Sequence, residues 1–524
     1  MINAAVETHG ERFNQQVGEV AVPPSPAIAS TGKALQPDAT PNPNRKKILF
    51  VTSEIADLVK TGGLGDVSAA LPRAMSPLHD VRVLIPGYPQ VVNSGHPIHV
   101  VGEMSGHAAL PPCKVGRMDM PDGLVIYVLL CPELYAREGT PYGANNGRDW
   151  PDNHIRFARL GLAAADIAAG QGMVHWRPDM VHAHDWPAGL APAYMHWRGL
   201  NIPTLFTIHN LAYQGVVSLA CCPELGIPEH ALQQDGMEFY GKLSFLKAGM
   251  AYSSHITTVS ATYAEEITTP EFGCGLDGFL SSKARKGLLS GIPNGIDESW
   301  ESATDPHLVC PFGLNDWDGK HVNADHVREL FELDQSEGPL FAVVSRLVFQ
   351  KGLDLTEAVA EFIVEKGGQI AIIGRGEPEE EQAMRDLALR FPGQVSARIG
   401  FNETDARRMF AGSDFLLMPS RYEPCGLSQM YAQRFGSLPV ARKTGGLADT
   451  IEDGITGFLF EASTVESYRE ALQRAFYVFG KPELLNAMRC RAMTQPFNWS
   501  QAVEPYAKLY EKMVDKAKGK SAKY

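Results

Sequence analysis

A glutamate and two cations stand in segments where they could act on an anionic substrate. Glu423 lies in SRYEPCGL, a turn stiffened by proline before an expected helix. Arg346 and Lys351 lie five residues apart in SRLVFQKG. A guanidinium can hold a phosphate through two bonds, and an ammonium adds a point charge. We interpret the three as candidates for binding a diphosphate and stabilising charge beside it. A solvated cation pair and a structural carboxylate at a helix start are the alternatives.

A glycine-rich heptapeptide occurs twice, as KTGGLGD at Lys60–Asp66 and as KTGGLAD at Lys443–Asp449. Glycine lets backbone N–H groups approach a ligand closely, and the start of a helix favours negative charge. Neither copy has the spacing of a P-loop or of a dinucleotide fingerprint. We therefore expect the two copies to grip one anionic ligand, with a simple strand-to-helix turn as the alternative.

Histidine and amide side chains follow two further expected strands. His182 and His184, two residues apart in VHAHDW, lie on one face of a strand end. His209 and Asn210 follow in TIHN. A metal site is one interpretation of the paired histidines, but no obvious third ligand stands nearby, and we favour hydrogen bonds to sugar hydroxyls. Asp152, in WPDNHIRF at an expected helix start, fits either an N-cap or a site residue.

Strands and helices must alternate to place these residues. Short β-branched runs such as KKILFV, DMVHAH, LFAVVS and DFLLMP each precede a polar or glycine-rich loop, and many of the loops lead into an amphipathic helix. Continuous apolar strands that alternate with helices predict parallel sheets covered on both faces. Ligands bind such sheets beyond the carboxyl ends of the strands, where the candidate residues are expected.

The chain divides into four predicted segments. Residues 1–45 are rich in Pro, Ala and Ser and predict a disordered extension. Residues 46–295 and 296–500 each predict a doubly wound Rossmann-like domain, and a turn-rich stretch joins them. Residues 501–524 predict a C-terminal helix and basic tail that pack back on the first domain. The predicted fold class is α/β, with two Rossmann-like domains facing each other across a cleft.

Composition excludes several classes of protein. The 524 residues are 44% hydrophobic and 20% charged, as in soluble globular proteins. A net charge of −13 argues against nucleic-acid and anionic-membrane partners, and no apolar run reaches membrane-spanning length. The eight cysteines include no CxxC pair, which predicts a reducing cytosol. Cys425, just before a helix start, is expected to favour its thiolate, with a small buried cysteine as the alternative.

Ten segments resemble bacterial glycogen synthases and plant starch synthases in order and spacing. They are KTGGLGDV, DVRVLIPGYP, DNHIRF, DMVHAHDWPAGLAPAY, TIHNLAYQG, LSFLKAG, NGID, LFAVVSRLVFQKGLDL, SRYEPCGLSQMYAQRFG and TGGLADTIED. The resemblance runs from residue 46 to the C-terminus. It implies a cytoplasmic, retaining glucosyltransferase of GT-B architecture that needs no metal or other cofactor. Its reaction would transfer glucose from ADP-glucose to the nonreducing 4-hydroxyl of an α-1,4-glucan and so elongate glycogen.

The resemblance also implies roles for residues, with the glucan on the first domain and the nucleotide sugar on the second. The implied catalytic residues are Glu423, His184, Lys351, Arg346 and Asp152. The implied substrate-binding residues are Lys60, Gly62, Gly63, Asp66, His209, Asn210, Gln214, Phe401, Cys425, Gly426, Thr444 and Gly445. Phe401 stands where some relatives carry tyrosine, which keeps an aromatic contact with a base but removes a hydroxyl.

Three other functions stay open as alternatives. A noncatalytic glucan-binding or regulatory protein of this fold would tolerate the loss of Lys60, Arg346, Lys351 or Glu423, and all four are present. A nicotinamide oxidoreductase would need GxGxxG after the first strand, which the first glycine loop does not match. A glucan phosphorylase would need a lysine that binds pyridoxal, and we identify none.

Overall fold

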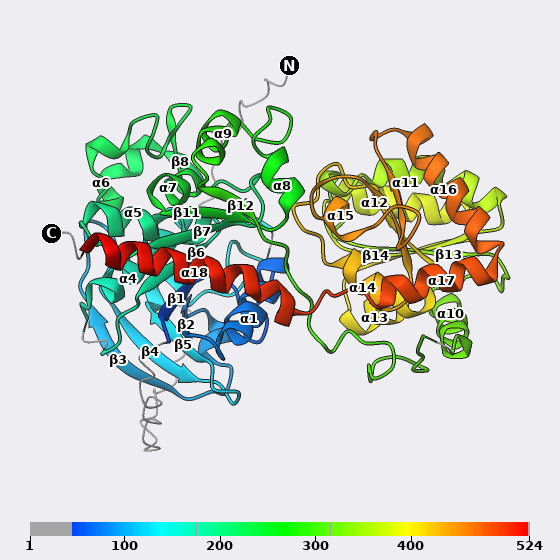
Figure 1. Ribbon diagram of the computed structural model, residues 1–524, viewed down its shortest axis with the longest axis horizontal. Helices are drawn as coiled ribbons and strands as arrows, with labels where there is room; N and C mark the ends of the chain where they lie inside the picture. The colour runs from blue at the N-terminus through cyan, green and yellow to red at the C-terminus, as the bar shows by residue number, and fades with distance from the viewer. Residues whose placement is uncertain (1–44, 146, 173–174, 315, 522–524) are drawn as a thin grey trace, which may run out of the picture. The chain divides into compact units, whose positions relative to one another are not determined.

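The computed structural model describes residues 45–145, 147–172, 175–314 and 316–521. The predicted disordered extension, residues 1–45, lies outside the described residues except for Arg45. One sheet of nine strands and one of six dominate the described part of the chain (Figure 1). We call the part built on the nine-stranded sheet the N-terminal lobe and the part built on the six-stranded sheet the C-terminal lobe.

The sheet of the N-terminal lobe has the strand order β12-β11-β7-β6-β1-β2-β5-β4-β3. Its strands are β1 (Lys47–Val51), β2 (Asp80–Pro86), β3 (Ile98–Met104), β4 (Cys113–Asp119), β5 (Val125–Leu130), β6 (Met180–His184), β7 (Thr204–Ile208), β11 (His255–Thr258) and β12 (Leu289–Gly291). The pairs from β12 to β5 are parallel, but β4 pairs antiparallel with β5, and β3 with β4. The expectation of wholly parallel strands is therefore wrong at this edge, where β4 mixes buried with part-exposed residues, as antiparallel strands can.

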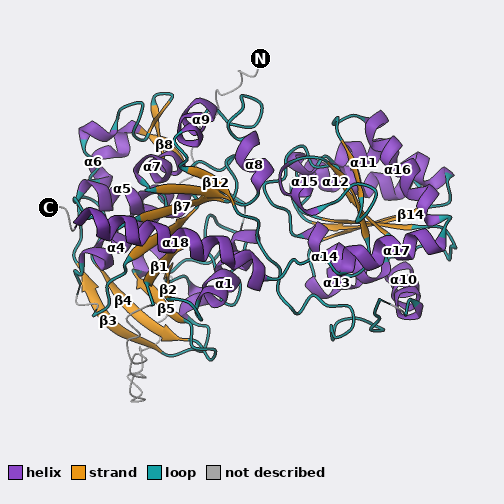
Figure 2. Cartoon of the chain, viewed as in Figure 1, coloured by secondary structure: helices purple, strands orange, loops and turns teal. Residues whose placement is uncertain are grey.

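Helices cover the sheet of the N-terminal lobe (Figure 2). They are α1 (Gly63–Met75), α2 (Pro89–Val92), α3 (Pro132–Tyr135), α4 (Asn153–Ala169), α5 (Leu190–Trp197), α6 (Cys222–Leu225), α7 (Phe245–Tyr252), α8 (Ala261–Glu266) and α9 (Asp277–Arg285). A small antiparallel sheet of β8 (Val216–Ser218), β9 (Glu238–Phe239) and β10 (Lys242–Ser244) lies between α5 and α7 in sequence. Helix α1 begins inside the first heptapeptide, as its glycines predict.

The sheet of the C-terminal lobe is parallel throughout, in the order β15-β14-β13-β16-β17-β18. Its strands are β13 (Leu340–Val344), β14 (Gln369–Gly374), β15 (Val395–Ile399), β16 (Phe415–Met418), β17 (Leu438–Arg442) and β18 (Phe458–Phe460). Adjacent residues of β13 pack on opposite faces of the sheet: Phe341 belongs to one core cluster and Ala342 to the other. The sheet is therefore buried on both faces, as its continuous apolar strands predict.

Helices of the C-terminal lobe form a layer on each face of its sheet (Figure 2). They are α10 (Asp318–Leu330), α11 (Leu353–Glu365), α12 (Pro378–Arg390), α13 (Glu403–Gly412), α14 (Ser428–Arg434), α15 (Gly445–Thr450), α16 (Val465–Phe479) and α17 (Pro482–Met493). Side chains of α11 and α16 pack in one core cluster, and side chains of α10 and α13 in the other. In the described ranges, no helix of either lobe is long and apolar enough to cross a membrane.

The last helix, α18 (Trp499–Ser521), packs on the N-terminal lobe (red in Figure 1). Its residues Val503, Tyr506 and Tyr510 belong to the core of that lobe. The Tyr510 hydroxyl lies 2.6 Å from Nδ1 of the buried His182. The chain therefore passes between the lobes twice, and the passages meet where the Ile296 amide donates to the carbonyl oxygen of Phe497 at 2.8 Å.

The carboxyl ends of the strands carry the candidate site residues. Strand β6 ends at His184, and His209 directly follows β7. Arg346 comes two residues after β13, and Thr444 two residues after β17. Parallel strands end at one edge of a sheet, so each lobe gathers its candidate loops along one edge.

Candidate active site

The buried Glu423 and the part-buried Lys351 form an ion pair in the C-terminal lobe. Glu423 lies in the turn between β16 and α14 and is 5% exposed. Its Oε2 accepts a hydrogen bond from Lys351 Nζ at 2.5 Å and another from Ser420 Oγ at 3.1 Å. A buried carboxylate needs such partners to stay charged. The pair can offer a carboxylate to a positive centre and an ammonium to a negative group within one small region.

Arg346 connects the two lobes through a tyrosine that the sequence analysis missed. Its Nη1 donates to Tyr213 Oη at 3.2 Å. Tyr213 precedes Gln214, which is buried and donates from Nε2 to the carbonyl oxygen of Cys274 at 3.0 Å. The guanidinium is exposed, so it can still reach an anion. Gln214, the neighbour of Tyr213 in the TIHNLAYQG motif, was a predicted site residue, but only the fold brings Tyr213 to Arg346.

The buried His184 and the part-buried His209 form an imidazole pair. His184 Nδ1 lies 2.9 Å from His209 Nε2, and the His184 ring stacks on Phe50. Burial lowers the pKa of His184 well below its usual range and that of His209 to about 3, so both rings are neutral near pH 7. Among the described residues, the buried Nε2 of His184 has no hydrogen-bond partner.

His182 faces the core rather than the site. Its Nδ1 lies 2.6 Å from Tyr510 Oη and its Nε2 2.6 Å from Thr207 Oγ1. Both nitrogens of the first histidine in VHAHDW are thus occupied by side chains. In the described ranges, the side chains that could together hold a metal ion are those of His154, Cys221 and Glu224, whose possible ligand atoms lie within 4.8 Å of one another. His182 therefore has no free nitrogen for a sugar hydroxyl, and the interpretation that we favoured stays a prediction for His184.

Asp185, which follows His184, holds the loop after β7. Its Oδ1 accepts a hydrogen bond from the His209 amide at 2.9 Å. Burial raises the pKa of Asp185 to about 7, against the backbone hydrogen bonds from His209 and Asn210 that lower it. Its φ of +56° is uncommon for a residue with a side chain. Asn210 Oδ1 accepts from the amide of Ala212 at 3.1 Å, which shapes the same loop.

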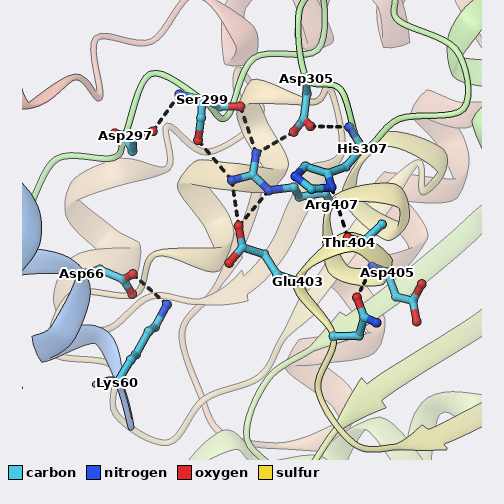
Figure 3. A network of polar contacts seen from close by, with 11 residues as sticks. Lys60, Asp66, Asp297, Ser299, Asp305, His307, Glu403, Thr404, Asp405 and Arg407 are labelled. Atoms are coloured by element: carbon cyan, nitrogen blue, oxygen red, sulfur yellow. Dashed lines mark hydrogen bonds and ion pairs between the residues drawn. The ribbon is translucent and has the colours of Figure 1, made fainter. Parts of the chain in front are cut away.

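Lys60 and Asp66, the ends of the first heptapeptide, form an ion pair at 2.7 Å (Figure 3). Both line a cavity of about 480 Å³ whose other lining residues come from both lobes. Burial raises the pKa of Asp66, against the lowering effect of Lys60. The lining of this cavity does not include Glu423 or Lys351, so the predicted residues fall into separate groups within the described structure.

A carboxylate that the sequence analysis missed binds the first glycine loop. Glu54 Oε2 accepts hydrogen bonds from the amides of Thr61 at 2.5 Å and Gly62 at 3.1 Å. Tyr142 donates its hydroxyl to the other oxygen. Burial raises the pKa of Glu54, although these hydrogen bonds lower it. Gly63, the first residue of α1, is exposed, and an amide at the start of a helix has no partner inside the helix.

The second glycine loop binds a carboxylate of the other lobe. Thr444 Oγ1 and the Gly445 amide donate to Glu266 Oε1 at 2.8 and 3.0 Å. Thr444 and Gly445 were expected to donate to the ligand, and in the structure the partner of these donors is Glu266. The physical reason is that α8 carries Glu266 to the loop from the N-terminal lobe. Lys443 lies at the surface and pairs with Glu461 at 2.8 Å.

Arg407 organises the C-terminal side of the cavity (Figure 3). It is 5% exposed, and its guanidinium binds Asp305 Oδ2 at 2.6 Å and Glu403 Oε1 at 2.9 Å. It also donates to the carbonyl oxygen of Ser299 at 2.9 Å and stacks over Trp300. Glu403 thereby presents its carboxylate to the cavity. The i,i+4 spacing of Glu403 and Arg407 on one helix was the available signal for this pair.

Asp152 and Phe401 differ in how firmly they are held. Asp152 precedes α4 but makes no capping hydrogen bond. Instead, both carboxylate oxygens accept from Arg137 at 2.6 Å. Against the desolvation that raises it, the Arg137 hydrogen bonds hold the pKa of Asp152 below its usual value. Phe401 follows β15 and is 66% exposed, which leaves its ring free to contact a flat ligand.

Cys425 and Gly426 complete the turn that begins at Glu423. Cys425 is 6% exposed, and burial raises the pKa of its thiol to about 12. The expectation that its thiolate is favoured is therefore wrong, because burial outweighs the nearby helix start. Gly426 has a φ of +70°, and its carbonyl oxygen accepts from Gln429 Nε2 at 3.0 Å.

Two α/β lobes, whose sheets are parallel except at the β3–β4 edge and carry polar loops at their strand ends, define a glycosyltransferase of the GT-B class. Residues 47–282 match the family described as starch synthase catalytic domain, and residues 329–478 match glycosyl transferases group 1. The sucrose-phosphate synthase of Thermosynechococcus elongatus has the same fold, with a TM-score of 0.55 and 16% identity over 89% of this chain and 99% of that chain.

Closer relatives identify the family. A glycogen synthase of Pseudomonas fluorescens is 79% identical over 523 residues, which cover 100% of both chains. A second, from another strain, is 83% identical over 483 residues, 92% of this chain and 99% of that one. The catalytic domain of starch synthase IV from Arabidopsis thaliana, solved with ADP and acarbose bound, superimposes with a TM-score of 0.80 at 30% identity over 90% of this chain and 100% of that chain. The chain belongs to the glycogen synthase family.

Proposed function

We propose that this chain elongates α-1,4-glucans by transferring glucose from ADP-glucose to a nonreducing 4-hydroxyl, with retention of the anomeric configuration. Membership of the glycogen synthase family supports the reaction. The ADP and acarbose bound to the Arabidopsis relative support the two substrates. The observation that carries the proposal is the ion pair of the buried Glu423 with the part-buried Lys351, 2.5 Å apart at the strand ends.

Charge develops on both sides of the bond that breaks. As the anomeric carbon leaves the diphosphate oxygen, the diphosphate becomes more negative, and Arg346 and Lys351 stabilise it. Glu423 positions the glucose and tempers the positive charge on its anomeric carbon. The acceptor oxygen forms the new bond on the same face, and its proton passes to the leaving diphosphate. Atoms and charge therefore balance without a covalent enzyme intermediate.

Other residues bind the substrates around this centre. Lys60 adds a cation from the N-terminal lobe, and the amide of Gly63 holds a phosphate oxygen, while Gly62, whose amide donates to Glu54, lets the backbone of the loop approach it. His184 uses its unpaired Nε2 for a sugar hydroxyl, with His209 behind it. The remaining proposed site residues are Asp66, Asp152, Asn210, Gln214, Phe401, Cys425 and Gly426.

Thr444 and Gly445 take a different role in the proposal from the one their sequence suggested. Their donors bind Glu266, so we assign them to the support of the Glu423 turn rather than to the donor diphosphate. We also keep as proposals a cytoplasmic location and domain limits at 1–45, 46–295, 296–500 and 501–524. No nucleic acid, membrane or metal takes part in the proposed reaction.

The test uses purified protein, glycogen, and either ADP-glucose or UDP-glucose in the presence of a chelator. We expect ADP release with matching growth of the glucan chains, and a new linkage of the α configuration. Glucan binding without nucleotide release would overturn the proposal in favour of a noncatalytic binding protein. Faster transfer from UDP-glucose would overturn the choice of donor only.

A further inference from the structure

Helices α8 and α15 belong to different lobes, and amides at the start of each helix donate to a carboxylate of the other. Asp449 Oδ2 in α15 accepts hydrogen bonds from the amides of Ala261 at 2.6 Å and Thr262 at 3.2 Å, at the start of α8. In return, Glu266 at the end of α8 accepts from Gly445 at the start of α15. A carboxylate is stabilised beside helix-start amides, so each contact favours the other.

We propose that Glu266 is a positioning residue for Glu423. The inference rests on the proposed function, since it concerns the carboxylate that acts in that reaction. Glu266 does not touch Glu423 itself in the contacts described. It acts through the Thr444–Gly446 loop, which it holds from the N-terminal lobe against the Glu423 turn.

The contact between this loop and the Glu423 turn leaves no free space. The Gly446 amide donates to the carbonyl oxygen of Glu423 at 2.9 Å. A Cβ atom on Gly445 would overlap that same oxygen, and one on Gly446 would overlap the carbonyl oxygen of Cys425. The two glycines are therefore needed for close backbone approach. A shift of the loop would move the backbone of Glu423 with it.

Helix α8 also holds the turn from a second point. Ser260 Oγ, at the start of α8, donates to the carbonyl oxygen of Pro424 at 2.6 Å and accepts from the amide of Tyr263 at 3.1 Å. The turn after Glu423 is thus fixed by one end of α8 directly and by the other end through Glu266. Two fixed points define the direction of the turn as well as its place.

The carboxylate of Glu266 is only half satisfied by hydrogen bonds. Its Oε2 is buried without a hydrogen-bond partner in the described part of the chain. Burial raises its pKa, against the hydrogen bonds from Gly445 and Thr444 that lower it. A half-satisfied carboxylate of this kind is unfavourable for stability alone. Positioning of the catalytic turn gives a reason for keeping it.

The experiment compares Glu266→Ala, Glu266→Gln and the control Glu265→Ala, which changes the exposed neighbour. A misplaced reacting group can lower the rate about a hundredfold, so we expect kcat of Glu266→Ala to fall by about tenfold to a hundredfold. The Kd for ADP, measured by calorimetry, should change by less than about twofold, because the cations that bind it are untouched. Glu266→Gln, which keeps an acceptor oxygen, should recover most of kcat.

Three outcomes would overturn the inference. They are unchanged kcat in both Glu266 variants, tighter ADP binding in both, and a glutamine variant as slow as the alanine variant with lost ADP affinity. The second would mean that Glu266 competes with the donor diphosphate for the loop. Thermal unfolding identifies a misfolded alanine variant, and the glutamine variant then decides alone. If the unmodified protein transfers no glucose, the proposed function fails instead.

Asp449→Asn tests the reciprocal half of the contact. It loosens α8 rather than the loop itself, so we expect a smaller fall in kcat with the same unchanged ADP affinity. Since the two carboxylates hold one pair of helices, the loss in the double variant with Glu266→Ala should be smaller than the product of the single losses. If the losses in kcat multiplied in the double variant, the two carboxylates would act independently, which would contradict the proposal that they hold one pair of helices together.

Discussion

The heptapeptides Lys60–Asp66 and Lys443–Asp449 differ only at Gly65 and Ala448, yet their surroundings have little in common. Each follows a parallel strand, opens a helix, and donates backbone N–H to a buried or half-buried glutamate. In the first copy the glutamate, Glu54, belongs to the same lobe. In the second copy the glutamate, Glu266, comes from the other lobe.

The glycines show the difference most directly. A Cβ on Gly62 would meet nothing within 4 Å, and one on Gly63 would meet a single leucine atom at 3.7 Å. Those on Gly445 and Gly446 would overlap the backbone of the Glu423 turn. Open space suits a ligand, whereas backbone contact suits support. One peptide can therefore serve binding in one lobe and positioning in the other.

The cations of the two copies differ in the same way. Lys60 lines the cavity of about 480 Å³, together with its partner Asp66. Lys443 forms a surface ion pair with Glu461. In the proposed reaction, the cations of the C-terminal lobe come from another loop, which carries Arg346 and Lys351. The repeated lysine is thus no guide to which cation acts.

The largest effect is expected from Lys351→Ala, which tests whether Lys351 is a cation of the C-terminal lobe that stabilises the leaving diphosphate. Removing a preorganised group that stabilises developing charge costs about 3 to 4 kcal/mol, so turnover should fall by about a hundredfold to a thousandfold. Arg346→Ala should behave alike. Steady-state kinetics with ADP-glucose and glycogen measure the effect. Near-native turnover in either variant would remove that residue from the diphosphate site.

Gly446→Ala and Gly62→Ala test the contrast between support and open space. The first should lower the free energy of unfolding by about 3 kcal/mol, because overpacking against backbone forces a local shift. The second should change it by less than about 0.5 kcal/mol, as substitutions away from such contacts do. Urea denaturation of both variants gives the comparison. Equal losses would mean that the two loops are packed alike.

Lys60→Ala and Lys443→Ala form a matched pair within the repeat. We expect Lys60→Ala to lower turnover by about tenfold to a hundredfold and to weaken ADP binding much less, since Lys60 acts in the closed, reacting state. Lys443→Ala should leave turnover within about twofold, as expected for an exposed ion pair. Kinetics and calorimetry on the two proteins separate the effects. A loss shared by both lysines would restore a common role for the repeat.

The smallest expected effect is a change in the pH dependence of the free energy of unfolding in Glu54→Gln. Burial raises the pKa of Glu54, so the folded chain holds this proton more tightly than the unfolded chain. The contribution of such an acid to stability is full when it is protonated and is lost as pH rises through the raised pKa. The glutamine variant should therefore gain unfolding free energy relative to the unmodified protein between acidic and neutral pH. If the free energies of unfolding of the two proteins changed in parallel with pH, the raised pKa of Glu54 would be contradicted.

Sequence alone determined the elements and most of the local chemistry of this protein. Apolar strands that end in polar loops predicted the sheets and the edges on which Lys351, Glu423 and His184 lie, because burial on both faces makes a strand continuously apolar. Family resemblance predicted the reaction. The antiparallel pairing of the edge strands β3 and β4 was not predicted, because the residues of a strand do not specify its pairing partner.

Only the tertiary structure decided which donors are free and which are already bound. Glu266 and Glu265 are adjacent and look alike in sequence, but one meets Gly445 across the lobes and the other is exposed. Cys425 stands near a helix start in sequence, but its burial governs its thiol. The physical reason is common to these cases. Hydrogen-bond partners and desolvation depend on atoms hundreds of residues away, whereas a motif describes only its own backbone.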